Sequence, residues 1–286
     1  MNDILALDAL SLSRRIRARD LSCRELMHAC LEQIEELNPR LNAIVSLEPE
    51  ERLFEQADHC DALLARGEWM GWMHGMPQAP KDLAATRGIR TTSGSPILAQ
   101  LVPAEDAAIV ERVRAAGAIL IGKTNVPEFG LGSQTFNEVF GATRNPWDLS
   151  RTAGGSSGGA AAALAARMLP VADGSDMMGS LRNPAAFCNV YGFRPSRGLV
   201  PNPLAPDLFC QQLSTDGPMG RTVADVARLL APQATIRAHR FRSMPIRRCS
   251  SGRSRATAGA SGSAGSATSA DTCLSTRVCS NCAATR

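Results

Sequence analysis

The stretch that decides the fold is AEDAAIVERVRAAGAILIGKTN, residues 104–125. Residues 107–116 predict a helix, and Gly117 stands where a helix commonly ends. The next four residues, 118–121, are all apolar. Such a run without alternation is typical of a strand buried on both faces of a parallel sheet. A helix followed at once by a strand of this kind predicts an α/β fold.

The chain on either side repeats this mixture of helices and strands. Residues 21–37 predict an amphipathic helix with Ser22 as N-cap and Glu25 completing a capping box. The pair Asn38-Pro39 is expected to end it. Further helices are predicted over 49–66 and 223–230, and short strands over 42–47 and 170–172. We therefore expect an α/β sandwich with a mostly parallel or mixed sheet.

The sequence changes character near residue 231. Residues 232–286 are rich in Arg, Ser, Ala and Thr, and 250–270 are of low complexity with few residues that could form a core. We expect residues 1–231 to fold and residues 232–286 to lie outside the folded unit. A reading-frame shift near residue 231 is our hypothesis for the change, and the DNA sequence around that codon tests it.

Charge and cysteine usage exclude several classes of protein. The formal net charge is +4, but residues 231–286 carry nine Arg and one acid, so residues 1–230 hold 22 basic against 26 acidic side chains. A mildly acidic body argues against a nucleic-acid surface. The scattered Cys predict buried thiols rather than disulfides. Cys279 and Cys282 form a C-x-x-C, but without a second pair at zinc spacing or a helix beside it the pair predicts neither a metal site nor a redox site. No signal peptide or membrane span is apparent, so a cytoplasmic enzyme is expected.

The first stretch with chemical potential is Gly154-Gly155-Ser156-Ser157-Gly158-Gly159. A flexible linker is one interpretation, but the run is short and lies between apolar elements. A phosphate loop would need a G-K-[ST] ending, which is absent. A nucleophile elbow would need a downstream acid and His, and only His239 follows.

The second stretch, DGSDMMGSLRNP, spans residues 173–184 and follows a predicted strand. Taken alone, it is compatible with a polar loop. The chain contains only two Lys, Lys81 and Lys123, against 29 Arg. Arg does not lose its proton in proteins, whereas a buried Lys can serve as a base. A solvated surface charge remains the alternative for Lys123.

These segments resemble the amidase signature family in order and spacing. The residues that carry the resemblance are Lys81-Asp82-Leu83, the Gly-Ser run 154–159 and the stretch 173–184. Flanking segments also look like the family: 74–77, 123–125, 145–147, 184–187 and 217–219. The resemblance covers about residues 5–230. It implies a three-layer α/β/α sandwich with a mixed, mostly parallel sheet, whose C-terminal part is missing from this chain.

The resemblance also implies the roles of individual residues. Lys81 looks like the base, Ser156 like a relay serine held by a cis peptide bond, and Ser180 like the nucleophile. Backbone N–H groups of Met177, Met178, Gly179 and Ser180 would form the oxyanion hole. Asp176, Ser157 and Arg182 would support the site, with Asp176 holding the turn and Arg182 anchoring the loop. No cofactor and no metal is expected.

Two residues depart from the family pattern. Met178 stands where a Gly is usual, which places a side chain near the acyl site. Pro80 precedes Lys81, where the family commonly has an apolar strand residue. Because proline removes a ladder donor, it predicts an edge position or a slight local shift.

Three functions stay open at this point. The first is an amidase acting on a small carboxamide substrate, and the second is the glutaminase subunit of a tRNA-dependent amidotransferase. That subfamily usually has Gln at position 183, where this chain has Asn183. The third is a catalytically inactive remnant or binding module. No nucleic-acid or membrane partner is expected, and a homodimer is kept as one oligomeric option.

Overall fold

The computed structural model describes residues 3–201 and 213–234. Helices and strands alternate along these residues, as the sequence predicts for an α/β fold. The helices are α1 (Asp3–Ala6), α2 (Ala9–Ala18), α3 (Cys23–Leu41), α4 (Glu50–Ala65), α5 (Ala108–Ala115), α6 (Gly158–Ala165), α7 (Arg182–Cys188) and α8 (Val223–Gln233). The strands are β1 (Ile44–Val45), β2 (Pro77–Gln78), β3 (Ile119–Leu120), β4 (Lys123–Thr124), β5 (Phe136–Asn137), β6 (Gly141–Ala142), β7 (Arg144–Asn145), β8 (Asp148–Thr152), β9 (Val171–Asp176), β10 (Tyr191–Gly192) and β11 (Thr215–Gly220).

Helix α3 has the predicted beginning but a later end. Ser22 and Glu25 form the capping box that the sequence predicts. The helix nevertheless continues through Pro39 to Leu41. It ends because Asn42 adopts a left-handed conformation, with φ 51°, and donates its N–H to the carbonyl of Asn38. Asparagine tolerates this conformation, which is why it can terminate a helix as glycine does.

The sheet is mixed, but its balance differs from the expectation. The parallel pairing among the described residues consists of β2 with β3 and a bridge between Lys81 and Thr124. The other described pairs, including β9–β11 and β11–β10, are antiparallel. The expectation of a mostly parallel sheet is therefore corrected for this part of the chain. Strand β10, which follows α7, runs in the same direction as β9, because both pair antiparallel with β11. The chain therefore reverses between Gly192 and Thr215, and β11 enters between its two neighbours from the opposite end.

The break before Lys81 agrees with the effect expected of Pro80. Pairing of β2 with β3 ends at Gln78, and the next parallel contact is the bridge at Lys81. Pro80 has no N–H, but its carbonyl accepts a hydrogen bond from Thr124 at 3.0 Å. The local shift thus leaves Lys81 anchored beside β4.

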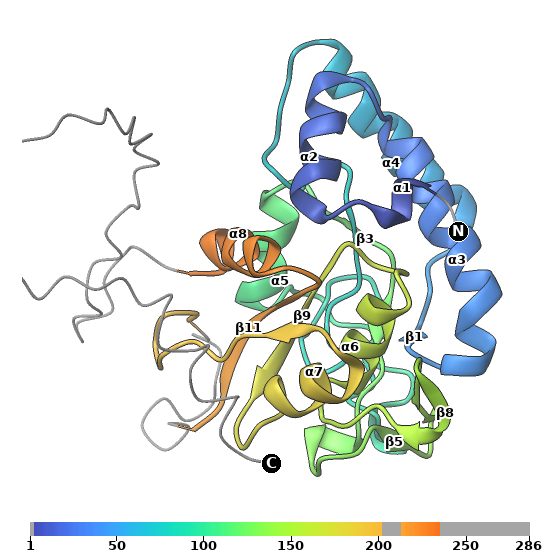
Figure 1. The fold of residues 1–286 in the computed structure, drawn as a ribbon, viewed down its shortest axis with the longest axis vertical. Helices are drawn as coiled ribbons and strands as arrows, with labels where there is room; N and C mark the ends of the chain where they lie inside the picture. The colour runs from blue at the N-terminus through green and yellow to red at the C-terminus, as the bar shows by residue number, and fades with distance from the viewer. Residues whose placement is uncertain (1–2, 202–212, 235–286) are drawn as a thin grey trace, which may run out of the picture. The chain divides into compact units, whose positions relative to one another are not determined.

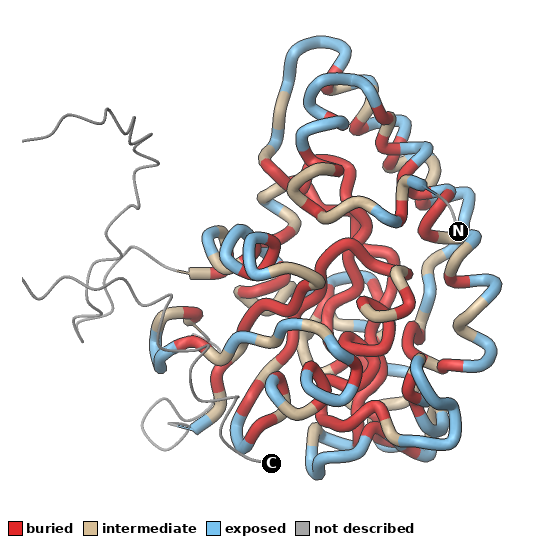
Figure 2. The backbone as a smooth tube through the Cα atoms, in the orientation of Figure 1, coloured by how far each residue is buried: buried red, intermediate tan, exposed pale blue. Residues whose placement is uncertain are grey.

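Helix α6 lies at the centre of the buried region, and its small residues make this position possible. All residues from Gly158 to Leu164 are buried, and Figure 2 shows buried backbone gathered in the middle of the unit. A Cβ on Gly159 would lie 2.3 Å from the backbone nitrogen of Asn125 and 2.7 Å from the carbonyl oxygen of Ala43. Only glycine permits this close approach, so α6 sits directly against β1 and β4.

The first and last described helices are tied together. In Figure 1, α8 lies beside α5, and β11 runs along β9. Arg221, just before α8, donates to the carbonyl oxygens of Leu5 and Leu7. The Asp225 carboxylate accepts the N–H of Leu10 at 3.1 Å. Residues more than 210 positions apart in the sequence are thus joined directly.

The predicted tail, residues 232–286, falls almost entirely outside the described residues. The frame-shift hypothesis and the predicted boundary at residue 231 therefore stay predictions. Within residues 3–201 and 213–234, no helix combines the length and apolar character needed to cross a membrane.

Candidate active site

Strand β9 ends in a tight turn that Asp176 organises. The Asp176 carboxylate accepts hydrogen bonds from the N–H of Gly179 at 2.7 Å and of Leu181 at 3.2 Å. Gly179 has φ +111°, and a Cβ there would lie 2.8 Å from the side-chain amide of Asn183. The turn between β9 and α7 therefore needs both the carboxylate and the glycine. It places Ser180 just before α7, half-buried.

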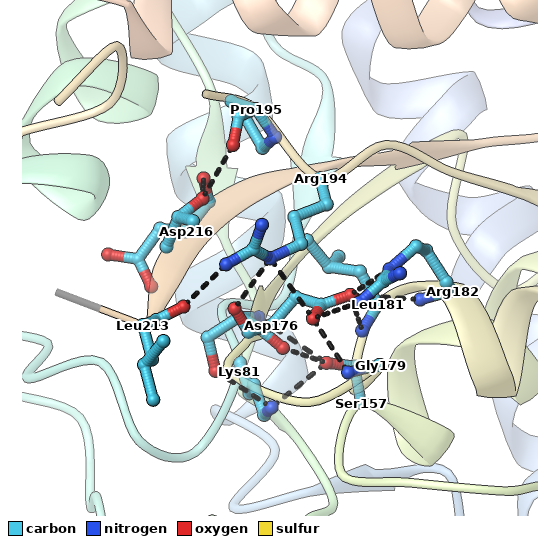
Figure 3. Close-up of polar contacts among 12 residues, drawn as sticks. Lys81, Ser157, Asp176, Gly179, Leu181, Arg182, Arg194, Pro195, Leu213 and Asp216 are labelled. Carbon is cyan, nitrogen blue, oxygen red and sulfur yellow. Dashed lines mark hydrogen bonds and ion pairs between the residues drawn. The ribbon is translucent and has the colours of Figure 1, made fainter. Parts of the chain in front are cut away.

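Two arginines hold the same carboxylate, as Figure 3 shows. Arg182 makes two hydrogen bonds to Asp176, at 2.9 and 3.0 Å, and Arg194 lies 3.3 Å from it. Burial opposes ionisation of Asp176, but the hydrogen bonds from Arg182, Gly179 and Leu181 outweigh it and lower the pKa of the carboxyl. Asp176 thus stays charged and fixes the turn. Arg182 anchors the loop in the way that the resemblance implied.

The glycine-serine stretch forms a second turn beside the first. The peptide bond between Gly155 and Ser156 is cis, as the resemblance implied. A Cβ on Gly155 would lie 2.8 Å from the backbone nitrogen of Gln134, so no larger residue fits there. The N–H of Ser157 donates to the carbonyl of Ser180 at 3.1 Å, which joins the two turns through their backbones.

Lys81 reaches into this junction from the loop after β2. Its Nζ lies 2.7 Å from Ser156 Oγ, 2.9 Å from Ser157 Oγ and 2.9 Å from Ser175 Oγ. The side chain is 2% exposed. Ser157 precedes α6 as its N-cap residue but makes no capping bond. Its hydroxyl is instead turned to the lysine.

Burial lowers the pKa of Lys81 to about 7, against the opposing effect of Asp216, Asp173 and Asp176. A large part of the amine is therefore uncharged near neutral pH, and an uncharged amine can accept a proton. Lysine in water, with a pKa of about 10.4, would be almost wholly protonated at that pH.

The structure brings some predicted site residues together and separates others. Lys81, Ser156 and Ser157 are in direct contact. Ser180 belongs to the adjoining turn, but among the described residues its hydroxyl makes no hydrogen bond. The backbone bond from Ser157 to the Ser180 carbonyl is what connects it to the cluster.

The predicted oxyanion hole needs one correction. The N–H of Gly179 is already bonded to Asp176 at 2.7 Å, so it is not available to an incoming oxygen. The N–H groups of Met177, Met178 and Ser180 make no hydrogen bond to any described residue. The Met177 and Met178 side chains are 48% and 81% exposed. Three donors, rather than four, remain free at this turn.

Four residues at the site were missed by the sequence analysis. Ser175 accepts a hydrogen bond from Lys81, Arg194 pairs with Asp176, and Asp173 binds the backbone N–H of Lys81 at 3.1 Å. Asp216 contributes to the electrostatics of the amine. The signal for Asp173 and Ser175 was present, because alternate residues of a strand share a face. Arg194 and Asp216 come from later segments whose pairing no local pattern reveals.

Lys123 is not the solvated surface charge that remained an alternative. It is fully buried, and its Nζ donates to the carbonyl of Ala84 at 2.5 Å and to Thr86 Oγ1 at 2.6 Å. Burial lowers its pKa to about 8, opposed by the charges of Asp82, Asp173 and Asp106. In the part of the chain that the structure describes, no group of three or more His, Cys, Asp or Glu could hold a metal ion.

The chain is similar to one known protein family and to several curated proteins. The family model described as Amidase matches residues 25–269. A glutamyl-tRNA(Gln) amidotransferase subunit from Alkaliphilus metalliredigens is 45% identical over 73% of this chain and 42% of its own length. The corresponding subunit from Acidothermus cellulolyticus is 44% identical over 81% of this chain and 45% of its own length. The chain thus spans less than half the length of these curated relatives.

Solved structures agree on the fold. A 6-aminohexanoate cyclic dimer hydrolase matches with a TM-score of 0.76 and 34% identity, over 85% of this chain and 49% of the other. The peptide amidase of Stenotrophomonas maltophilia matches with a TM-score of 0.71 and 34% identity, over 80% of this chain and 48% of the other. The predicted α/β fold class and the resemblance are confirmed.

Proposed function

The chain belongs to the amidase family, and from this premise we propose that it hydrolyses the amide C–N bond of a small carboxamide through an ester on Ser180. One observation carries the proposal. A buried lysine with a pKa lowered to about 7 lies 2.7 Å from the hydroxyl of Ser156, which follows a cis peptide bond. A lysine that can be neutral beside a serine is a combination suited to activating a nucleophile.

The proposed first step forms the ester. Neutral Lys81 takes the hydroxyl proton of Ser156 as Ser156 takes that of Ser180. The oxygen of Ser180 attacks the amide carbon, and the C–N bond then breaks. The proton returns from Lys81 through Ser156 to the departing nitrogen, which leaves as a neutral amine.

The second step restores the enzyme. Water gives a proton along the same path and attacks the ester carbon, and the carboxylic acid leaves as Ser180 regains its proton. The negative oxygen formed in both steps would be bound by the free N–H groups of Met177, Met178 and Ser180. One such donor is worth about 2.7–4 kcal/mol in the transition state. Asp176, held by Arg182, would keep these donors in place.

Covalent labelling tests the proposal. A fluorophosphonate probe is expected to modify Ser180 of the folded protein, and Ser180→Ala should abolish the modification. Ser150, an exposed serine on β8, provides the matched control: Ser150→Ala should label as the parent does. If the folded parent is not labelled, the chain is an inactive remnant or a binding module, and the proposal is rejected.

A second candidate rests on the names of the curated relatives. Those relatives are amidotransferase subunits, which favours a glutaminase working with partner proteins. Asn183 argues against it, because the amidotransferase subfamily usually has Gln at that position. Release of ammonia from glutamine, compared with release from simple carboxamides, separates the two: glutamine should react faster only in a glutaminase. Location in the cytoplasm stays a prediction.

A further inference from the structure

Asp216 faces the lysine from a strand that the proposed reaction does not use. In the antiparallel pair of β9 and β11, Asp216 lies directly opposite Ser175. Side chains at opposite positions of such a pair stand on the same face of the sheet with their Cβ atoms about 4.5–5.5 Å apart. Ser175 Oγ is 2.9 Å from Lys81 Nζ. The carboxylate of Asp216 is therefore on the lysine side of the sheet.

Asp216 also differs from the other carboxylates near the amine. Asp173 accepts hydrogen bonds from the N–H of Lys81 and from Gln78, at 3.1 and 2.9 Å. Asp176 is held by the turn and by arginines. By contrast, no described residue donates a hydrogen bond to the Asp216 carboxylate, and Figure 3 shows it beside the site without such a partner. Its charge is thus the least compensated of the three.

We propose that Asp216 is a positioning residue for Lys81, whose negative charge sets how firmly the amine holds its proton. The role of Asp216 in catalysis rests on the proposed function. Its effect on the protonation of Lys81 does not. A carboxylate near a buried amine favours the protonated form. Asp216 thereby keeps Lys81 basic enough to take a proton, where burial alone would make it too weak a base.

The electrostatics of the site agree with this role. Burial and the nearby Asp173 raise the pKa of Asp216 to about 6, against the opposing charge of Lys81. Burial lowers the pKa of Lys81 to about 7, and Asp216 is the largest opposing influence, ahead of Asp173 and Asp176. Lys81 and Asp216 therefore titrate in the same range and affect one another. Among residues 3–201 and 213–234, the charged groups that act on the amine are Asp173 and Asp176 on β9 and Asp216 on β11.

The chain offers a direct measurement, because it has only two lysines. Protein carrying ¹³C at lysine Cε would give two side-chain signals, and Lys123→Arg identifies the signal of Lys123 by its loss. Replacing Asp216 by Asn should lower the titration midpoint of Lys81 by about one pH unit. The midpoint of Lys123 should stay unchanged.

Two further variants make the result specific. Asp216→Glu keeps the charge and should restore the midpoint of Lys81 towards the parent value. Thr215→Val changes the neighbouring β11 residue, whose hydroxyl contacts backbone carbonyls, and should leave the midpoint unchanged. If Asp216→Asn does not fold, Asp216→Thr removes the same charge and carries the same expectation. A folded uncharged variant with an unchanged Lys81 midpoint would overturn the inference.

The pH dependence of Ser180 labelling tests whether Asp216 affects the reaction through Lys81. The pH at which labelling is half-maximal should move down with the Lys81 midpoint in Asp216→Asn, and labelling at high pH should become slower because the base is weaker. Absence of labelling in the parent would reject the proposed function, while the lysine titration would still decide the role of Asp216. Labelling whose pH midpoint stays unchanged in Asp216→Asn would overturn the role in catalysis.

Discussion

The two lysines of this chain are both buried, yet their surroundings differ in a decisive way. Lys81 is bonded to three serine hydroxyls, and Lys123 to a backbone carbonyl and one threonine hydroxyl. A serine hydroxyl can accept a hydrogen bond and also give up a proton, whereas a carbonyl can only accept. The Thr86 hydroxyl beside Lys123 already donates its proton to the carbonyl of Ala84 at 3.1 Å. Burial lowers the pKa of both amines. What distinguishes a base from a structural cation here is the partner, not the burial.

Lys123 has neighbours that suggest a structural task. It binds the chain at Ala84 and Thr86, and the charge of Asp82 lies near it. Asp82 in turn accepts hydrogen bonds from the side chain and N–H of Thr92 and from the N–H of Gly94. These contacts fix the loop that follows Lys81. Lys123, on β4, thus stabilises the loop that holds Lys81 in place.

The largest expected effect comes from removing each amine in turn. Lys81→Met should slow the labelling of Ser180 by about 10²–10⁴-fold, because the base is lost. Lys123→Met should slow it less than about tenfold, since only the support of the loop changes. Labelling rates of folded variants at fixed pH provide the measurement. Equal losses in both variants would contradict the distinction.

The next effect is on how the free energy of unfolding depends on pH. Both lysines have a lower pKa when folded, about 7 and about 8, than the value of about 10.4 expected when unfolded. Between these limits the unfolded chain binds more protons, so the lysine contribution to the free energy of unfolding rises with pH, by up to ~1.4 kcal/mol per pH unit for each lysine.

Denaturant titrations of the parent and the two Met variants between pH 8 and 10 measure this contribution. The comparison is needed because burial raises the pKa of the Cys30 and Cys188 thiols to about 12, which makes their contribution fall over the same range. From pH 8 to 10, the free energy of unfolding of each Met variant should therefore rise less, or fall more, than that of the parent. A variant with the parent's slope would show that its lysine is not perturbed.

The third effect is on the pH dependence of the reaction. Below a pKa of about 7 the Lys81 amine is protonated and cannot accept the proton of Ser156. The labelling rate should therefore fall about tenfold for each pH unit below that value and level off above it. Lys123→Arg should leave this midpoint in place, whereas a midpoint that follows Lys123 would reverse the assignment of the two lysines.

The smallest effect separates the hydroxyl partners. Ser175→Ala removes one of three bonds to Lys81 and should slow labelling by roughly tenfold, which corresponds to about 1–1.5 kcal/mol. Thr86→Val removes the hydroxyl partner of Lys123 and should cost about 1–3 kcal/mol of stability, because a buried donor is left unpaired. Its labelling rate should stay within about twofold of the parent. Thermal melts and labelling rates of the two variants check both parts.

The sequence predicts part of this fold from local chemistry. Helix α3 is set by its apolar spacing and by Ser22 with Glu25, and the α5–β3 unit by Gly117 and the apolar run after it. The sheet was less predictable, because strands of two residues have no measurable alternation. Their direction depends on how distant segments return, as β11 does beside β9.

The site, like the fold, has residues that could be predicted from the sequence and residues that could not. The resemblance alone supplied Lys81, Ser156 and Ser180, since no local pattern identifies a lysine as a base. The burial of Lys123 and the place of Asp216 depend on contacts across the sheet. Asp216 lies 135 positions after Lys81 in the sequence. Electrostatic neighbours of this kind are visible only after the chain is folded.

The contacts of Arg221 and Asp225 with residues 5–10 have a consequence for biosynthesis. Leu10 and Asp225 are 215 positions apart, and a ribosome adds about 5–20 residues per second. Helices α1 and α2 therefore wait roughly 10–40 s for the partners that complete their docking. During that delay the apolar faces of α1 and α2 remain exposed and accessible to chaperones. The helices that are synthesised first are thus among the last to dock fully.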